Sequence, residues 1–252
     1  MRRTPVAITV LTGLAVGGAF FASTATAAPA VPAKVEVATI IPNPPFAMRK
    51  NGKLTGFDVQ LANAAAKAAG IQALEWRPSQ DLSAEITAVT LGEVPMAASS
   101  LTITPTRQKQ MIFSTPYLNA DLAVVTAQGK KYGAGGNLTN LTVGALKGST
   151  SATYLKSLPG NVIEVLFPDQ TSAYQALLRG SINAVVNDYA QSDWYVLHNN
   201  AKFDLPAIIN QPGKLAFAFT KDQTNLRNAF NKGLAIVKQN GTLARLKNQW
   251  LP

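Results

Sequence analysis

Strand-like and helix-like segments alternate along most of this chain of 252 residues, and this alternation restricts its fold more than any other feature. Short apolar or β-branched runs, such as 35–41, 142–146, 184–187 and 215–220, predict buried strands. Segments between such runs, for example 57–69, 81–91 and 190–198, predict helices, the second of them with Asp81 as its N-cap. Strands that alternate with helices predict α/β sheets with helices on both faces.

The alternation falls into two groups, which predict two lobes. We expect a first lobe from residues 34–117 and 216–252 and a second lobe from residues 121–212. The segments 117–121 and 212–216 would form a hinge between them. In open α/β sheets, ligands bind beyond the carboxyl ends of the strands, where helix N-termini point. A cleft between the lobes would therefore collect polar groups from both sheets.

The amino-terminal residues have the pattern of a signal peptide. Two arginines precede an uncharged stretch over 6–22, and Ala25-Thr26-Ala27 supplies an A-x-A cleavage site, so we expect 1–27 to be removed and 28–33 to form a Pro/Ala spacer. The alternative is a membrane anchor, because about seventeen residues lie near the lower limit for a span. Without a cysteine at the cleavage point we expect no lipid anchor, and a mature protein in the periplasm or the medium.

Composition excludes several classes of function. The chain has no cysteine and one histidine, which removes thiolate chemistry and multi-histidine metal centres, so we expect neither a metal nor a cofactor. The predicted leader carries two of the 23 basic residues and no acid. The remainder then has 21 basic and 13 acidic residues, a net charge of +8. Because the basic residues are scattered, we expect no nucleic-acid partner.

A polar segment follows the predicted strand at 96–100 and enters a helix. Thr104 is placed to cap that helix and Pro105 to occupy its first position. Arg107 then lies on the first turn, where a basic side chain is unfavourably close to the positive end of the helix dipole. A bound carboxylate would correct this and could also meet Thr102. An ordinary capped helix with a solvated arginine fits the same pattern.

Two further polar segments end predicted strands. Lys147-Gly148-Ser149-Thr150-Ser151 could hold an anion with backbone N–H groups and hydroxyls, or could be a simple capped turn. Asp188 ends an apolar strand, where it could cap the next helix or face a ligand ammonium. Together the three segments supply a guanidinium, a carboxylate and several hydroxyls, a set complementary to a zwitterion.

These residues resemble the amino-acid-binding family of extracytoplasmic solute receptors of ABC transporters, over nearly all of the predicted mature chain. Six motifs occur in the family's order. They are Pro45-Phe46 with Gly56-Phe57-Asp58-Val59-Gln60-Leu61, residues 101–107, Phe113-Ser114-Thr115-Pro116-Tyr117, Lys147-Gly148-Ser149-Thr150, residues 180–188, and Asn240-Gly241-Thr242-Leu243-Ala244 leading to Trp250.

The resemblance implies a two-lobed periplasmic-binding-protein fold of type II, with a two-strand hinge and a cleft that closes on an amino acid. It places the carboxylate anchor on Arg107, with support from Ser100, Thr102, Ser149 and Thr150, and the amino-group acceptor on Asp188. It also implies a monomer that delivers its ligand to a membrane ABC permease. Three positions depart from the family's pattern: Gln60, Pro95 and Ser100.

The resemblance also indicates where the ligand side chain would lie. The matching positions are Ile40, Asn43 and Leu82, which favour an apolar or small polar side chain over a cationic one. Arg77 and the basic surface leave an acidic amino acid open.

Two other functions remain open. The first is an enzyme on the same scaffold, such as a cyclohexadienyl or prephenate dehydratase-like protein, which would need a general acid of raised pKa in the cleft. The sequence does not place Glu85, Glu93 or Glu164 there. The second is a sensor or scavenger that works without a transporter.

Overall fold

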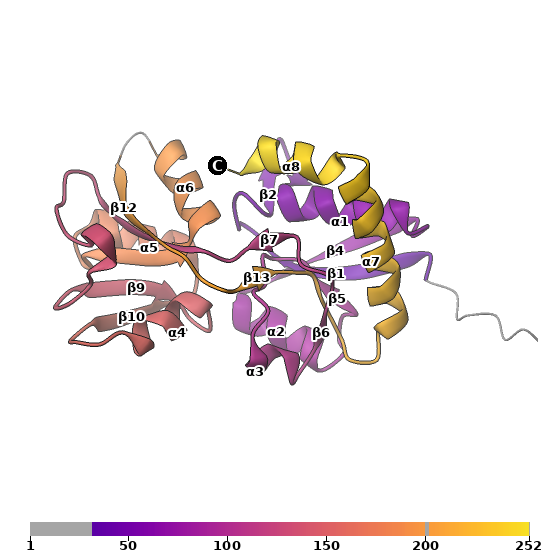
Figure 1. Cartoon of the computed structure of the whole chain (residues 1–252), viewed down its shortest axis with the longest axis horizontal. Coiled ribbons are helices and arrows are strands. Elements are labelled where there is room, and N and C mark those ends of the chain that lie inside the picture. The colour runs from indigo at the N-terminus through magenta and orange to yellow at the C-terminus, as the bar shows by residue number, and fades with distance from the viewer. Residues whose placement is uncertain (1–31, 200–201, 252) are drawn as a thin grey trace, which may run out of the picture. The chain divides into compact units, whose positions relative to one another are not determined.

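The structure is a computed structural model, and it describes residues 32–199 and 202–251 (Figure 1). The predicted leader 1–27 and most of the spacer 28–33 lie outside the described residues. Within the described part, the chain forms two five-stranded sheets, two two-stranded pairs and eight α-helices. The predicted α/β class is therefore confirmed.

The first sheet has the strand order β4-β1-β5-β14-β6. Its strands are β1 (Lys34–Ile40), β4 (Ala73–Ser79), β5 (Met96–Ala97), β6 (Ile112–Phe113) and β14 (Ala218–Phe219). β1 is parallel to β4 and β5, whereas β14 is antiparallel to β5 and β6. Neighbouring residues point to opposite faces, so Val37 and Phe219 lie in one core while Ala38 and Ala218 lie in the other.

The second sheet has the strand order β10-β9-β11-β8-β12. Its strands are β8 (Leu122–Ala127), β9 (Thr142–Leu146), β10 (Ile163–Phe167), β11 (Ala184–Asp188) and β12 (Phe203–Ile209). β9 is parallel to β10 and β11, and β8 is antiparallel to β11 and β12. Here too the residues alternate, with Val124 in one core and Val125 in the other.

Helices cover both faces of each sheet. They are α1 (Phe57–Ala68), α2 (Leu82–Thr90), α3 (Pro105–Gln108), α4 (Thr150–Ser157), α5 (Gln170–Leu178), α6 (Tyr189–His198), α7 (Thr224–Gln239) and α8 (Thr242–Trp250), with a 3-10 turn η1 (Ala134–Gly136). α1, α7 and α8 pack together, and α2 packs on β1 and β5. A Cβ at Gly233 of α7 would lie 2.0 Å from the Ala65 carbonyl oxygen, so this close approach of α7 to α1 requires glycine.

The chain passes between the sheets twice. β7 (Leu118–Asn119) lies within the first passage and β13 (Lys214–Leu215) within the second, and they pair antiparallel to one another (Figure 1). The sequence predicted one strand over 215–220, but two short strands with different partners, β13 and β14, occupy this region. It also missed β12 and the hairpin of β2 (Met48–Lys50) and β3 (Lys53–Thr55). The lobe and hinge bounds given above stay a prediction.

Candidate functional site

A small cavity is lined by segments from the carboxyl ends of strands in both sheets. Its volume is about 40 Å³. We call it the arginine cavity. All eight residues predicted for the site line it: Asn43, Leu82, Ser100, Thr102, Arg107, Ser149, Thr150 and Asp188. The structure thus brings together residues up to 145 positions apart in the sequence, while their role in ligand binding stays a prediction.

Arg107 reaches the cavity from the short helix α3. Thr104 caps this helix by accepting from the Arg107 N–H at 3.2 Å, and Pro105 takes its first position, as predicted. The Arg107 side chain donates from Nη1 to the Thr102 carbonyl (2.9 Å) and from Nη2 to the Gly148 carbonyl (3.3 Å). Burial lowers the Arg107 pKa, against the opposing pull of Asp188 and Glu85. Arg107 is only 8% exposed, so its predicted alternative as a solvated surface residue is wrong.

Asp188 ends β11 and stands at the N-cap position of α6. Its side chain makes no capping hydrogen bond, which contradicts the reading of this residue as a helix cap. Burial raises the Asp188 pKa to about 7, although Arg107 lowers it. In the described part of the chain, ion pairs form at Lys34–Glu75, Arg77–Glu36 and Lys156–Glu164, and none involves Arg107 or Asp188. The two opposite charges therefore share one cavity without a salt-bridge partner.

The turn before α4 forms the opposite wall. Gly148 has a φ of +76°, and its carbonyl accepts from Arg107. Ser149 caps α4 by accepting from the Ala152 N–H at 3.1 Å, so the simple capped turn that the sequence left open is present. The Ser149 hydroxyl is thus already engaged, and Thr150, the first residue of α4, also lines the cavity.

Two buried acids lie behind the Ser99–Thr102 segment, and the sequence assigned neither a role. Asp58 Oδ2 accepts from the Ser100 N–H (2.6 Å) and from the Tyr117 hydroxyl (2.9 Å). Ser99 Oγ donates to Glu85 Oε1 at 2.6 Å. Burial raises the pKa of Asp58 to about 7 and that of Glu85 to about 8. These carboxyls hold the segment that carries Ser100, whose φ is +52°, where the family's pattern has glycine.

Three amide side chains meet at another part of the cavity. Asn43 Oδ1 accepts from Gln170 Nε2 at 3.3 Å and from Gln191 Nε2. Asn43 was a predicted site residue, but Gln170 and Gln191 were not. One signal was available for Gln191, which lies one helical turn after Asp188. Gln170 is the first residue of α5, and no local sequence pattern indicated that the start of this helix would lie in the cavity.

The predicted apolar positions also line the cavity, but Arg77 does not. Ile40 and Leu82 form part of the wall. Arg77 lies on β4, and its half-exposed side chain is 3.8 Å from Glu36. Arg77 therefore gives no support to an acidic ligand, which corrects the sequence-based expectation.

Comparison with known proteins identifies the family. The model of the family described as bacterial extracellular solute-binding proteins, family 3, matches residues 35–252 of this chain. The chain belongs to this family. The two-lobed fold with a hinge and a cleft, implied earlier by resemblance, is thereby confirmed.

Relatives of this solute-binding protein bind amino acids. It is 28% identical to the ABC transporter arginine-binding protein 1 of Escherichia coli strain K12, covering 83% of this chain and 87% of the relative. It is 27% identical to the lysine/arginine/ornithine-binding periplasmic protein of the same organism, covering 99% and 97%. A solved ancestral arginine-binding protein, bound to arginine, is 32% identical with a TM-score of 0.81, covering 87% of this chain and 99% of that one.

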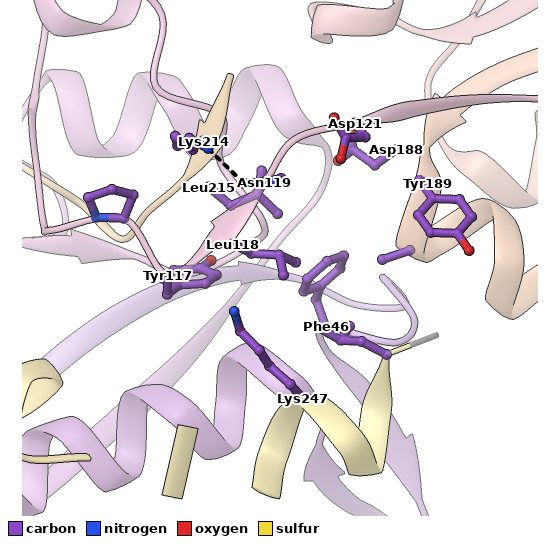
Figure 2. A pocket seen from close by; sticks show the side chains of 13 residues that line it. Phe46, Tyr117, Leu118, Asn119, Asp121, Asp188, Tyr189, Lys214, Leu215 and Lys247 are labelled. Atoms are coloured by element: carbon purple, nitrogen blue, oxygen red, sulfur yellow. Dashed lines mark hydrogen bonds between the residues drawn. The ribbon is translucent and has the colours of Figure 1, made fainter. Parts of the chain in front are cut away.

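A second cavity shares Asp188 with the arginine cavity, and we call it the lysine cavity (Figure 2). It measures about 440 Å³, and its walls include Phe46, Tyr117, Tyr189 and Lys247. Figure 2 shows Lys247 reaching from α8 toward Tyr117. A third cavity, of about 570 Å³, adjoins the arginine cavity and shares Thr102, Arg107, Ser149 and Thr150 with it.

No helix within residues 32–199 and 202–251 of this solute-binding protein is both long enough and apolar enough to cross a bilayer. Members of its family are extracellular proteins, and one relative named above is periplasmic.

Proposed function

We propose that this solute-binding protein captures a free amino acid between its lobes and delivers it to a membrane ABC permease, working as a monomer without a nucleic-acid partner. The supporting observation is that Arg107 and Asp188, which have opposite charges and come from different lobes, line one cavity and have no salt-bridge partner among residues 32–199 and 202–251. An amino acid carries both complementary charges. Its carboxylate would bind Arg107 and its ammonium Asp188.

Binding begins with opening of the cleft. A cavity of about 40 Å³ holds a few water molecules and is too small for an amino acid. Three hydrogen bonds join the lobes there: Arg107 to Gly148, and both Gln170 and Gln191 to Asn43. These bonds must break before a ligand enters. The ligand carboxylate then replaces the Gly148 carbonyl as the partner of Arg107.

Closure on the ligand is favourable because it pairs charges that burial otherwise penalises. Removing Arg107 and Asp188 from water costs free energy unless each finds a partner. Each charge-assisted hydrogen bond to the ligand contributes about 1.5–3 kcal/mol. The ligand contacts both lobes only in the closed form, so it shifts the population toward that form, which the permease would recognise.

Export to the periplasm or the medium fits this function. The leader-like pattern of residues 1–27 supports it, and so does membership of a family of extracellular proteins. A solute captured outside the cytoplasm is the one that an importing permease needs.

A thermal-shift screen of the twenty amino acids and common organic acids tests the proposal. A true ligand at about 100 times its Kd should add about 2.7 kcal/mol to the free energy of unfolding. A screen in which organic acids stabilise the protein and no amino acid does would contradict it.

The enzyme alternative can be tested on the same protein by an assay for dehydration of prephenate. One similar structure, 28% identical with a TM-score of 0.76 over 87% of this chain and 96% of that one, is an ancestral amino-acid-binding protein described as a precursor of cyclohexadienyl dehydratase. Of the three raised-pKa acids named above, Asp188 alone lines the arginine cavity, and the binding role already uses it. If the protein formed phenylpyruvate from prephenate, it would be a dehydratase and the proposed binding role would be wrong.

A further inference from the structure

We propose that the arginine cavity selects an amino acid whose side chain ends in a neutral carboxamide, as in glutamine or asparagine. This inference rests on the proposed function, because it assumes that the ligand backbone lies between Arg107 and Asp188. It concerns the remaining part of the cavity, where Asn43, Gln170 and Gln191 meet.

The three amides come from three separate elements and are all buried. Asn43 follows β1, Gln170 begins α5 and Gln191 lies on the first turn of α6. Asn43 and Gln191 are 3% exposed and Gln170 is 9% exposed. Each carboxamide both donates and accepts hydrogen bonds, and rotating it by 180° exchanges the two. Such a set is complementary to another carboxamide, which also has one donor end and one acceptor end.

Two polar atoms of the cavity lining have no hydrogen-bond partner within the part of the chain that the structure describes. Gln170 Oε1 and Asn187 Nδ2 are both buried without a hydrogen bond. A buried polar group that lacks a partner costs free energy, so a ligand that satisfies these groups gains affinity. Gln170 Oε1 needs a donor and Asn187 Nδ2 needs an acceptor, and a carboxamide supplies one of each. A thioether or an alkyl side chain supplies no N–H or O–H donor.

The charges of the lining disfavour ionised side chains. Among the described residues that line the arginine cavity, the ionisable side chains are Arg107 and Asp188. The proposed function assigns both to the ligand backbone. A guanidinium or ammonium at the amide end would be buried without a carboxylate, and a ligand carboxylate would be buried without a cation. This chain would therefore differ from its arginine-binding relatives in the ligand it selects.

Calorimetric titration of the full-length chain with glutamine, asparagine, arginine, glutamate and methionine tests the inference. Methionine is the matched apolar ligand because it has nearly the length of glutamine without the amide. We expect glutamine or asparagine to bind at least about tenfold more tightly than the other three, which corresponds to one well-made hydrogen bond. Arginine, glutamate or methionine binding as tightly as both amides would overturn the inference while leaving the proposed function intact. Failure of every amino acid to bind would overturn the proposed function, and this inference with it.

Two substitutions at one position then test the mechanism. Gln170→Glu adds a carboxylate of the same shape and should raise the arginine-to-glutamine affinity ratio at least about tenfold. Gln170→Met keeps the length, removes the polar atoms and should abolish the preference for glutamine over methionine. The control is Gln175→Glu on the exposed side of the same helix, which should leave every ratio unchanged. If Gln170→Glu does not fold, Gln170→Met decides alone, and a glutamine preference that survives it refutes the assignment.

Discussion

The arginine cavity and the lysine cavity share Asp188 in their walls, and they differ in size and in chemistry. The arginine cavity measures about 40 Å³ and the lysine cavity about 440 Å³. Room for an amino acid therefore exists in the lysine cavity, whereas the polar groups that suit one gather in the arginine cavity. Cavity volume depends on how closely the two lobes approach, and three hydrogen bonds between them narrow the arginine cavity. We therefore base the proposed position of the ligand on the kinds of side chain brought together and not on cavity volume.

The lysine cavity is lined largely by the edge of the first lobe's core. Phe46 and Tyr117 in its wall are almost fully buried and belong to that core. Its two cations are Lys214, which donates to Asn119 Oδ1 at 2.7 Å, and Lys247, whose pKa is lowered by burial and by Lys238. Lys247 and Asp188 nevertheless both line this cavity, so it is the rival position for a zwitterion.

The largest expected effect separates the two cavities directly. Arg107→Ala should weaken amino-acid binding by about 3–5 kcal/mol, because the ligand carboxylate would be buried without its partner. That corresponds to roughly two to four orders of magnitude in Kd, measured by calorimetry. Lys247→Ala is the matched control, and its Kd should stay within about threefold of the wild-type value. The opposite pattern, with Lys247→Ala causing the large loss, would move the ligand to the lysine cavity.

The second prediction concerns Asp188, which borders both cavities. Asp188→Asn keeps the shape of the side chain but removes the charge that would meet the ligand ammonium. We expect a loss of about 1.5–3 kcal/mol for the preferred amino acid, measured by calorimetry. A ligand of the same structure without the amino group should bind equally to the variant and to the wild type. Equal losses for both ligands would show that Asp188 does not contact the amine.

The smallest expected effect is a pH dependence that has opposite signs for stability and for binding. Burial raises the pKa of Asp188 and Asp58 to about 7 and that of Glu85 to about 8, far above their ordinary values. The folded state therefore holds these protons more tightly than the unfolded state. The stability this provides is complete below pH 4 and is lost as the pH rises through 7 to 8. Binding needs ionised Asp188, so affinity should rise over the same upper range.

Melting curves and titrations between pH 5 and pH 9 measure both trends. Glu85→Gln keeps an acceptor for Ser99 and should reduce the loss of stability at high pH, while the rise in affinity remains. Asp188→Asn should remove the rise in affinity. An affinity that falls with pH in the wild-type protein would instead indicate an anion held by Lys247, whose ammonium has a lowered pKa.

Local sequence patterns were enough to predict many elements of the fold and their caps. The Thr104-Pro105 start of α3 and the caps at Asp81 and Ser149 depend on neighbouring residues only, and all three are present. The strands that the sequence missed, such as β12 and the very short β7, lack a strong local pattern and depend on pairing with distant segments. For Asp188 the residue pattern left a helix cap and a ligand acceptor open, and only the family resemblance favoured the acceptor; the structure shows no capping hydrogen bond from its side chain.

The sequence by itself determined the α/β class and the residue types at the ends of strands, because strand and helix periodicity and capping act over a few residues. Only the tertiary structure decided which of these strand ends share a cavity. It placed Gln170 and Gln191 against Asn43, and it buried Asp58 and Glu85 behind Ser99 and Ser100. These contacts join residues from 14 to 148 positions apart. Such pairs are set by the packing of whole sheets and helices, which no local pattern records.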